Sequence, residues 1–385
     1  MGCSSSSSKA NKGSCADSGG TEGWQKYVAL SKEDQKLPRV HKAEADILSL
    51  MPIPFEARDV MVPLDVKPRC SLCIKRGCCC GYHPEIYEWP VHTVVVGSEH
   101  DDKLPIVLVH GFMMGAACFF KLYPMLAAER RVYAIDVIGM GGSGQPPFRA
   151  DSITPEGAED LLVEPFVQWA QAMALGEFVL LGHSFGGYVS AAWAARDPGR
   201  VKHLGLLSPL LGWTDDRISR AVNREGSSWQ RKAFTSIVES AWGHHITPQT
   251  LIRWIPGAEG FFKKNAEKRF GRGQQLTEEE CAFLAEYTVA TMLTPASFEA
   301  AATVCFEPFC KPVEMAGGTI KARLAGLKTP MFAIYGDRDW MDQATSEEIP
   351  NCRFHILSDS GHHLYFDNPE GLSKMIFVEM AAPSA

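Results

Sequence analysis

The chain has 385 residues, of which 45% are hydrophobic and 22% are charged, as in an ordinary globular protein. Its formal net charge of −7 argues against a general nucleic-acid binder, because a phosphate backbone requires a clustered positive surface. No run of about 18 apolar residues is free of polar interruption, so no membrane-spanning helix is predicted. The N-terminus lacks the apolar segment of a signal peptide, and we expect the 12 cysteines to be thiols in a reducing compartment.

The N-terminal residues carry a lipidation pattern. The segment from Met1 to Ser6 fits N-myristoylation at Gly2, and Cys3 is then placed for S-acylation. Two acyl chains hold a protein stably on a membrane, whereas one holds it only marginally. We therefore expect residues 1–35 to form a flexible, lipidated tether and the protein to lie on the cytoplasmic face of a membrane. A disordered Ser-rich tail, with a cytoplasmic or lipid-droplet location, is the alternative.

The next segment combines a helix, a hairpin and a cysteine-rich loop. Apolar spacing predicts a helix over His41–Met51, and residues 55–66 and 88–96 are expected to pair as two strands. The intervening loop, residues 67–83, holds five cysteines: Cys70, Cys73, Cys78, Cys79 and Cys80. A zinc knuckle that includes His83, palmitoylation beside Lys75 and Arg76, and unmodified thiols all remain open.

From Leu104 onward, short apolar strands alternate with helices. The predicted strands are residues 105–109, 132–136, 178–181, 201–207, 330–335 and 353–357, and helices are expected over 158–175 and 187–196. This alternation indicates an α/β fold with a mostly parallel sheet, whose two parts are residues 36–210 and 323–385. Residues 211–322 show no convincing strand and are expected to form an inserted helical cap.

A nucleophile motif follows the strand at residues 178–181. Gly182-His183-Ser184-Phe185-Gly186 has the form G-x-S-x-G and precedes a helix pattern, which is the context that a nucleophile elbow requires. A serine hydroxyl needs an adjacent base to become a good nucleophile. Ser184 is therefore the predicted nucleophile.

The partners of Ser184 are expected just beyond two later strands. His362 is the predicted base, with His363 as the alternative. Asp339 is predicted to orient the imidazole, with Asp337 and Asp342 as alternatives. The backbone N–H groups of Phe112 and Phe185 would form an oxyanion hole, because Phe112 follows the strand at 105–109 in His110-Gly111-Phe112.

Taken together, these motifs resemble the α/β-hydrolase superfamily. The shared segments occur in the family's order and span most of residues 104–370: His110-Gly111-Phe112, Asp136 to Ser143, Gly182 to Gly186, Gly336 to Asp339 and Gly361-His362. The resemblance implies a serine hydrolase that uses no cofactor and no metal.

Three local features resemble the α/β-hydrolase-domain 4 and 5 branch: Phe166 to Trp169 ahead of Leu175-Gly176, Asp339 to Asp342, and His362 to Asp367. This resemblance implies lipid substrates: phospholipids, lysophospholipids or N-acyl phospholipids. Some members are acyltransferases, which the H-x4-D pair of His362 and Asp367 brings into consideration, and some are catalytically dead lipase regulators. Ser184 disfavours the dead form, and Asp367 is also explained as the start of a helix capped by Asn368.

The expected cap is locally basic. Residues 217–272 contain eleven Lys or Arg and four Asp or Glu, although the whole chain is acidic. Trp254, Phe261 and Phe262 are interleaved with basic residues, namely Arg253, Lys263, Lys264, Lys268 and Arg269. Such a face suits an anionic lipid surface, whereas the alternative is a solvated helix whose aromatic side chains pack on the core. We expect a monomer that hydrolyses acyl-lipid esters or amides, with a lysophosphatidic acid acyltransferase or a lipase-regulating scaffold as alternatives.

Overall fold

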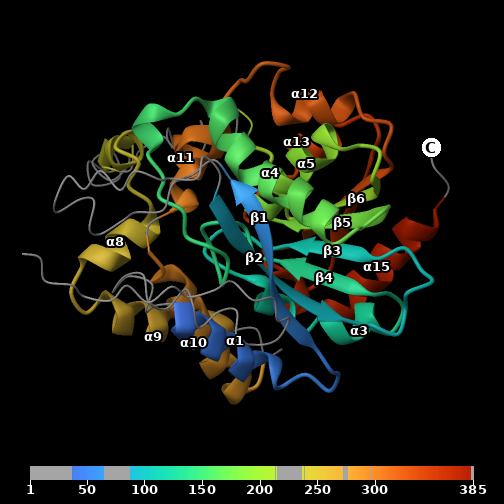
Figure 1. The fold of residues 1–385 in the computed structure, drawn as a ribbon, viewed down its shortest axis with the longest axis horizontal. Coiled ribbons are helices and arrows are strands. Elements are labelled where there is room, and N and C mark those ends of the chain that lie inside the picture. The colour runs from blue at the N-terminus through green and yellow to red at the C-terminus, as the bar shows by residue number, and fades with distance from the viewer. Residues whose placement is uncertain are drawn as a thin grey trace, which may run out of the picture.

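An eight-stranded sheet forms the centre of the molecule (Figure 1). The computed structural model describes residues 37–64, 87–212, 214, 236–237, 239–271, 276–295 and 297–382. The predictions on Gly2, Cys3, the cysteine-rich loop and residues 217–235 therefore lie outside the described residues. The strands are β1 (Glu56–Leu64), β2 (Tyr87–Val96), β3 (Ile106–Val109), β4 (Val132–Ile135), β5 (Phe178–His183), β6 (Val201–Leu207), β9 (Met331–Gly336) and β10 (Cys352–Leu357).

The sheet order is β1-β2-β4-β3-β5-β6-β9-β10. The predicted hairpin is confirmed, because β1 pairs antiparallel with β2, and β2 in turn pairs antiparallel with β4. The pairs from β4 to β10 are all parallel. The carboxyl ends of these six strands therefore lie at one edge of the sheet, where the sequence places its motifs.

Both faces of the sheet are covered, which explains why its strands are continuously apolar. In β3, Val107 and Val109 join one core while Ile106 and Leu108 join the other, as the two-residue period of a strand requires. The first core includes residues of α4 (Pro155–Ala172), α5 (Phe185–Arg196), α11 (Ala302–Cys305) and α12 (Ile320–Ala325). The second includes residues of α1 (Leu37–Leu48), α3 (Tyr123–Ala127), α10 (Glu278–Met292), α14 (Leu364–Asp367) and α15 (Pro369–Ala381). Helix α1 begins four residues before the predicted start, and its Val40 is buried.

The described residues of the segment 211–322, the predicted cap, are mainly helical. They include α8 (Pro248–Trp254), α9 (Ala258–Phe270) and α10, and α10 begins at a capping box formed by Thr277 and Glu280. Helices α9 and α10 pack against each other, and α1 packs on α10 (Figure 1). The region also holds a strand pair that the sequence did not predict, β7 (Phe306–Glu307) with β8 (Lys311–Pro312); two residues are too few to give a period. Helix α12 spans residue 322, where the cap was expected to end, and packs against α5.

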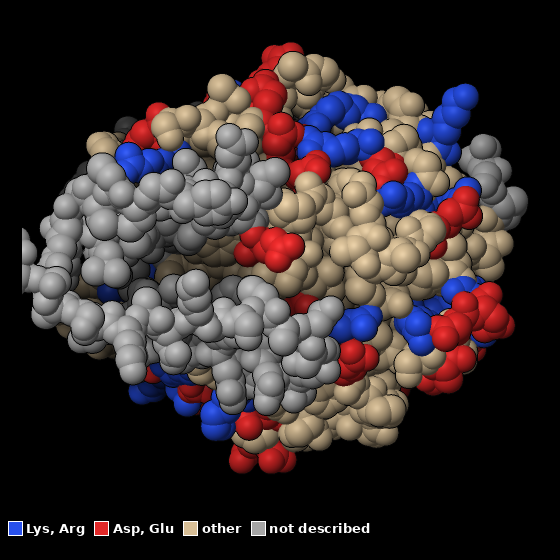
Figure 2. All heavy atoms as spheres, viewed as in Figure 1, with Lys and Arg blue, Asp and Glu red and all other residues tan. Residues whose placement is uncertain are grey.

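The remaining short elements are η3 (Ala116–Phe119), η4 (Ala150–Ser152), η6 (Phe298–Ala301), η7 (Pro308–Cys310) and α13 (Ala344–Glu347). None of the described helices combines the length and apolarity needed to cross a bilayer. On the face shown in Figure 2, basic and acidic side chains are interspersed around a broad uncharged area.

Candidate active site

Ser184 occupies a sharp turn between β5 and α5. Its φ of 54° and ψ of −119° lie in a region that residues with a side chain rarely adopt. The flanking glycines make this turn possible. A Cβ at Gly182 would lie 2.4 Å from the carbonyl oxygen of Gly186, and a Cβ at Gly186 would lie 2.3 Å from that of His110. The G-x-S-x-G spacing thus follows from close backbone packing around the serine.

A hydrogen-bonded chain joins Ser184, His362 and Asp339. The Nε2 atom of His362 lies 3.1 Å from Ser184 Oγ, and its Nδ1 atom lies 3.1 Å from Asp339 Oδ1. Because a carboxylate only accepts, Nδ1–H donates to Asp339 and Nε2 accepts from the serine hydroxyl. Ser184 is 9% exposed and His362 8%, while the Asp339 side chain is fully buried. Although burial opposes it, hydrogen bonding to His362 lowers the pKa of Asp339.

The alternative partners contact other groups. His363 accepts a hydrogen bond at Nδ1 from Arg269 of α9, at 2.9 Å. Asp342 accepts from the backbone and hydroxyl of Thr214, at 2.8 and 2.7 Å. Asp337 accepts from the backbone N–H groups of Asp359 and Ser360, and thereby ties the loop after β9 to the loop after β10. Of the candidates, the structure therefore brings His362 and Asp339 to the serine.

The loop after β3 lies directly against the serine turn. A Cβ at Gly111 would lie 3.1 Å from the Cβ of Ser184, and the rings of Phe112 and Phe185 pack edge to face with centroids 5.6 Å apart. Phe185 is the first residue of α5, so its backbone N–H is one of the donors that a helix leaves without a partner within the helix. The two predicted oxyanion donors thus belong to adjoining segments.

Two buried side chains brace this loop. Asp136 accepts from the N–H groups of Ala116 and Gly142, at 2.5 and 2.6 Å, and burial raises its pKa to about 7. His110 donates from Nδ1 to the carbonyl of Gly111 and accepts at Nε2 from the N–H of Val137. Burial lowers the pKa of His110 to about 4, so its ring is neutral. His110 thus acts as a structural hydrogen-bonding residue.

The second residue of the H-x4-D pair supports the backbone next to His362. Asp367 Oδ2 accepts from the N–H of Gly361 at 2.8 Å. Asn368 caps α15, accepting from the N–H of Gly371, and Pro369 stands at the first helical position. Asp367 therefore bonds to the loop that carries His362. The imidazole of His362 itself is hydrogen-bonded to Ser184 and to Asp339.

His183 has a role in the site that the sequence did not predict. Its Nε2 lies 2.9 Å from the carbonyl oxygen of His362, so Nε2–H donates to it, and Nδ1 faces the hydroxyl of Tyr365 at 3.5 Å. Burial, aided by repulsion from His362, lowers the pKa of His183 to about 3. A neutral His183 therefore holds the backbone of His362 in place. The only signal in the sequence was its position immediately before Ser184.

Part of the expected basic face of the cap is neutralised. The Arg253 side chain is 11% exposed and pairs with the buried Glu299 at 2.5 Å, and Lys263 pairs with Glu286 at 2.8 Å. Lys264, Lys268 and Arg269 are exposed. Of the nine large apolar side chains that are exposed among the described residues, five lie between residues 237 and 261: Ile237, Leu251, Trp254, Ile255 and Phe261. The exposed aromatic and basic side chains of α8 and α9 therefore lie near one another in sequence.

A small cavity lies between the cap and the core loops. Its walls come from the loops after β3 and β4, from α8, from α10 and the residues that follow it, and from η6. Met113, which directly follows Phe112, is one of the lining residues. Its polar lining residues are Gln249, Arg253, Thr291, Thr294 and Glu299. Space beside the loop of the predicted oxyanion hole thus has both apolar and polar walls.

The chain is similar to known proteins in sequence and in fold. Residues 105–369 match the profile of the alpha/beta hydrolase fold family. A probable 1-acylglycerol-3-phosphate O-acyltransferase of Oryza sativa subsp. japonica is 32% identical over 297 residues, which cover 74% of this chain and 69% of that protein. A (Lyso)-N-acylphosphatidylethanolamine lipase of Homo sapiens is 26% identical over 362 residues, which cover 91% and 93% of the two chains. The crystal structure of naproxen esterase from Bacillus subtilis aligns with a TM-score of 0.56 at 15% identity, over 91% of this chain and 99% of that one.

Proposed function

The chain belongs to the α/β-hydrolase fold family and resembles its domain 4 and 5 branch, and from this premise we propose that it is a serine hydrolase of acyl lipids. The observation that carries the proposal is the hydrogen-bonded chain of Ser184, His362 and Asp339. The nucleophile, base and orienting carboxylate stand in the geometry that acyl transfer requires.

The reaction proceeds through an acyl-enzyme. Ser184 Oγ attacks the acyl carbonyl carbon as its proton passes to His362 Nε2, and Asp339 stabilises the imidazolium that forms. The N–H groups of Phe112 and Phe185 stabilise the oxyanion, and losing one such donor raises the barrier by about 3 kcal/mol. His362 then returns the proton to the leaving alcohol or amine. Water, activated by the same imidazole, attacks the acyl carbon and releases the fatty acid and Ser184.

The substrate class is a phospholipid, lysophospholipid or N-acyl phospholipid. Support comes from the names of the two relatives, which refer to 1-acylglycerol-3-phosphate and to (lyso)-N-acylphosphatidylethanolamine. The exposed Phe261, Lys264 and Lys268 of α9, together with the exposed Trp254 of α8, add side chains suited to anionic lipid. Acylation at Gly2 and Cys3 supplies the second membrane signal and places the enzyme on the cytoplasmic face of a membrane.

Acyl transfer is the second candidate, because the Oryza relative is named for it. His362 is hydrogen-bonded to Ser184, and Asp367 accepts from the N–H of Gly361. A separate acyltransferase site formed by the H-x4-D pair is therefore not favoured. Transfer instead uses the same acyl-Ser184, with the hydroxyl of a lysophospholipid attacking in place of water. The ratio of fatty acid to diacyl product from one labelled acyl donor measures this partition.

A fluorophosphonate probe tests the enzyme against the scaffold alternative. Wild-type chain is expected to be labelled and to release fatty acid from lyso-N-acylphosphatidylethanolamine, while Ser184→Ala does neither. Ser190→Ala, on the same helix α5, is the matched control and is expected to be labelled. Equal lipolysis by wild type and Ser184→Ala would overturn the proposal.

A further inference from the structure

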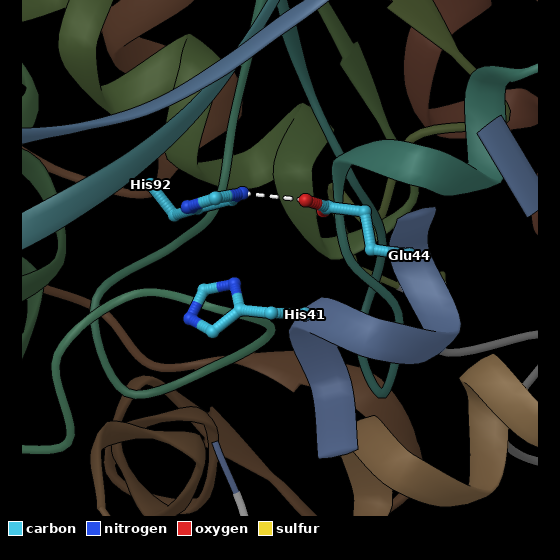
Figure 3. A group of neighbouring side chains, drawn as sticks. All are labelled: His41, Glu44 and His92. Atoms are coloured by element: carbon cyan, nitrogen blue, oxygen red, sulfur yellow. Dashed lines mark hydrogen bonds and ion pairs between the residues drawn. The ribbon is translucent and has the colours of Figure 1, made fainter. Parts of the chain in front are cut away.

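A second cluster of polar side chains lies where α1 meets β1 and β2. His41 and Glu44 stand three residues apart on one face of α1, and both point toward His92 of β2 (Figure 3). One ligand atom from each of these three residues lies within 4.8 Å of the other two. Glu44 is 3% exposed and His92 4%, whereas His41 is half-buried, so the cluster is enclosed but approaches solvent at one side.

His92 is held in the orientation of a metal ligand. Its Nδ1 lies 2.8 Å from Asp59 Oδ1, and Asp59 is the cross-strand partner of His92 in the β1–β2 pair. Its other nitrogen, Nε2, faces Glu44 Oε1 at 2.7 Å and points into the cluster. Histidines that bind metals usually carry such a carboxylate on the nitrogen that does not face the ion, because it fixes the ring and its tautomer.

Glu44 leaves one oxygen unaccounted for. Its Oε2 is buried and has no hydrogen-bond partner among the described residues. A buried carboxylate oxygen without a partner is costly and calls for a cation or donor. With Asp59 close by, the cluster brings two carboxylates to His92, a charge that one divalent cation would balance.

We propose that His41, Glu44 and His92 bind a divalent transition-metal ion, of which Zn²⁺ is the best match to two imidazoles and one carboxylate. Glu44 contributes Oε1 and Oε2, or Oε1 together with a water molecule. The proton between His92 Nε2 and Glu44 leaves to solvent as the ion takes its place. Asp59 is a positioning residue that keeps Nε2 directed at the ion.

The ion would join α1 to the sheet. It links α1 to the β1–β2 hairpin, and the ring of His41 also packs on Gly142, where a Cβ would lie 2.8 Å from the ring. From α1, Arg39 reaches the cap through ion pairs with Glu259 and Glu286. The site is therefore structural: it fixes α1 between the sheet and the cap and takes no part in the chemistry at Ser184.

Cobalt titration of the full chain tests the proposal. Cys70, Cys73, Cys78, Cys79 and Cys80 are replaced by serine so that no thiolate of that loop contributes. We expect one Co²⁺ per chain, with the visible bands of a four- or five-coordinate site, and displacement by Zn²⁺.

Variants of the cluster test each residue in turn. His41→Ala should weaken Co²⁺ binding at least tenfold. Asp59→Asn should weaken it about 10- to 100-fold while the bands persist. His100→Ala, outside the cluster, is the control and should bind Co²⁺ with the same affinity as the serine-substituted chain.

Two results would overturn the proposal. One is the absence of stoichiometric Co²⁺ binding by the serine-substituted chain, which would leave Asp59, His92 and Glu44 as a hydrogen-bonded ion cluster only. The other is binding of equal affinity in the parent and His41→Ala. Circular dichroism of His41→Ala checks that the variant is folded, and Glu44→Gln, which keeps the shape of the side chain, must lose binding as well.

Discussion

The backbone of Ser184 is strained, because this residue has a positive φ of 54° in the turn that presents its hydroxyl. A residue with a Cβ at positive φ costs roughly 1–2 kcal/mol more than glycine does. We therefore expect Ser184→Gly to be about 1 kcal/mol more stable to urea than Ser184→Ala, although neither is active. Ala192→Gly in the middle of α5 should show the opposite sign, because glycine is unfavourable inside a helix. Equal stability of the two Ser184 variants would contradict the claim of strain.

The carboxylate that serves His362 can be identified by substitution. Asp339→Asn leaves the shape of the side chain intact but no longer stabilises an imidazolium, so kcat should fall on the order of 10⁴-fold. Asp342→Asn should lower kcat by less than about tenfold, since Asp342 bonds to Thr214. Steady-state hydrolysis of a lysophospholipid by the two variants gives the comparison. A larger loss at Asp342 than at Asp339 would reverse the assignment.

His183 couples stability to pH. Its pKa is about 3 in the folded chain against an ordinary 6.5, so between these values only the unfolded chain takes up the proton. Stability contributed by a neutral His183 is therefore complete above pH 6.5 and is lost as the pH falls. His183→Gln keeps an N–H donor for the carbonyl of His362 but does not titrate.

The free-energy cost of His183→Gln should therefore shrink by about 1.4 kcal/mol per pH unit between roughly pH 6 and pH 4. Urea unfolding of wild type and variant across this range measures the cost. A cost that stays the same at every pH would contradict a neutral, hydrogen-bonded His183.

Helices α8 and α9 present the surface that we propose for lipid. A basic residue near an anionic membrane contributes about 1 kcal/mol, so Lys264→Glu with Lys268→Glu should weaken vesicle binding more than tenfold. The control pair is Lys328→Glu with Lys374→Glu, two exposed lysines elsewhere that give the same change in net charge. Sedimentation with phosphatidylserine vesicles, using chain without N-terminal acyl groups, isolates the contribution of the cap. Equal losses in both pairs would show that only total charge matters.

The elements that the sequence predicted well are those whose pattern is local. Strands such as β3 and β5 are apolar on both faces and end at recognisable motifs, so their order and the position of Ser184 could be inferred. The strand pair β7–β8 was missed because two residues show no alternation. The ion pairs that neutralise Arg253 and Lys263 were also missed, because their acidic partners lie 46 and 23 residues away.

Segments that are distant in the sequence converge on one edge of the sheet. Ser184, Asp339 and His362 follow β5, β9 and β10, and parallel pairing brings these strand ends to the same side. The motif order in the sequence therefore predicted which residues meet. It could not predict the cluster of Glu44 and His92, which are 48 residues apart and belong to no recognisable motif.

Detection of an acyl-enzyme is the most direct test of Ser184 as the nucleophile. The chain is mixed with the p-nitrophenyl ester of a long-chain fatty acid, quenched in acid and examined by mass spectrometry of the intact chain and its peptides. We expect a burst of one nitrophenolate per chain and an added acyl group on the peptide that carries Ser184, both absent in Ser184→Ala. Undiminished turnover by Ser184→Ala, or an acyl group found on another residue, would contradict it.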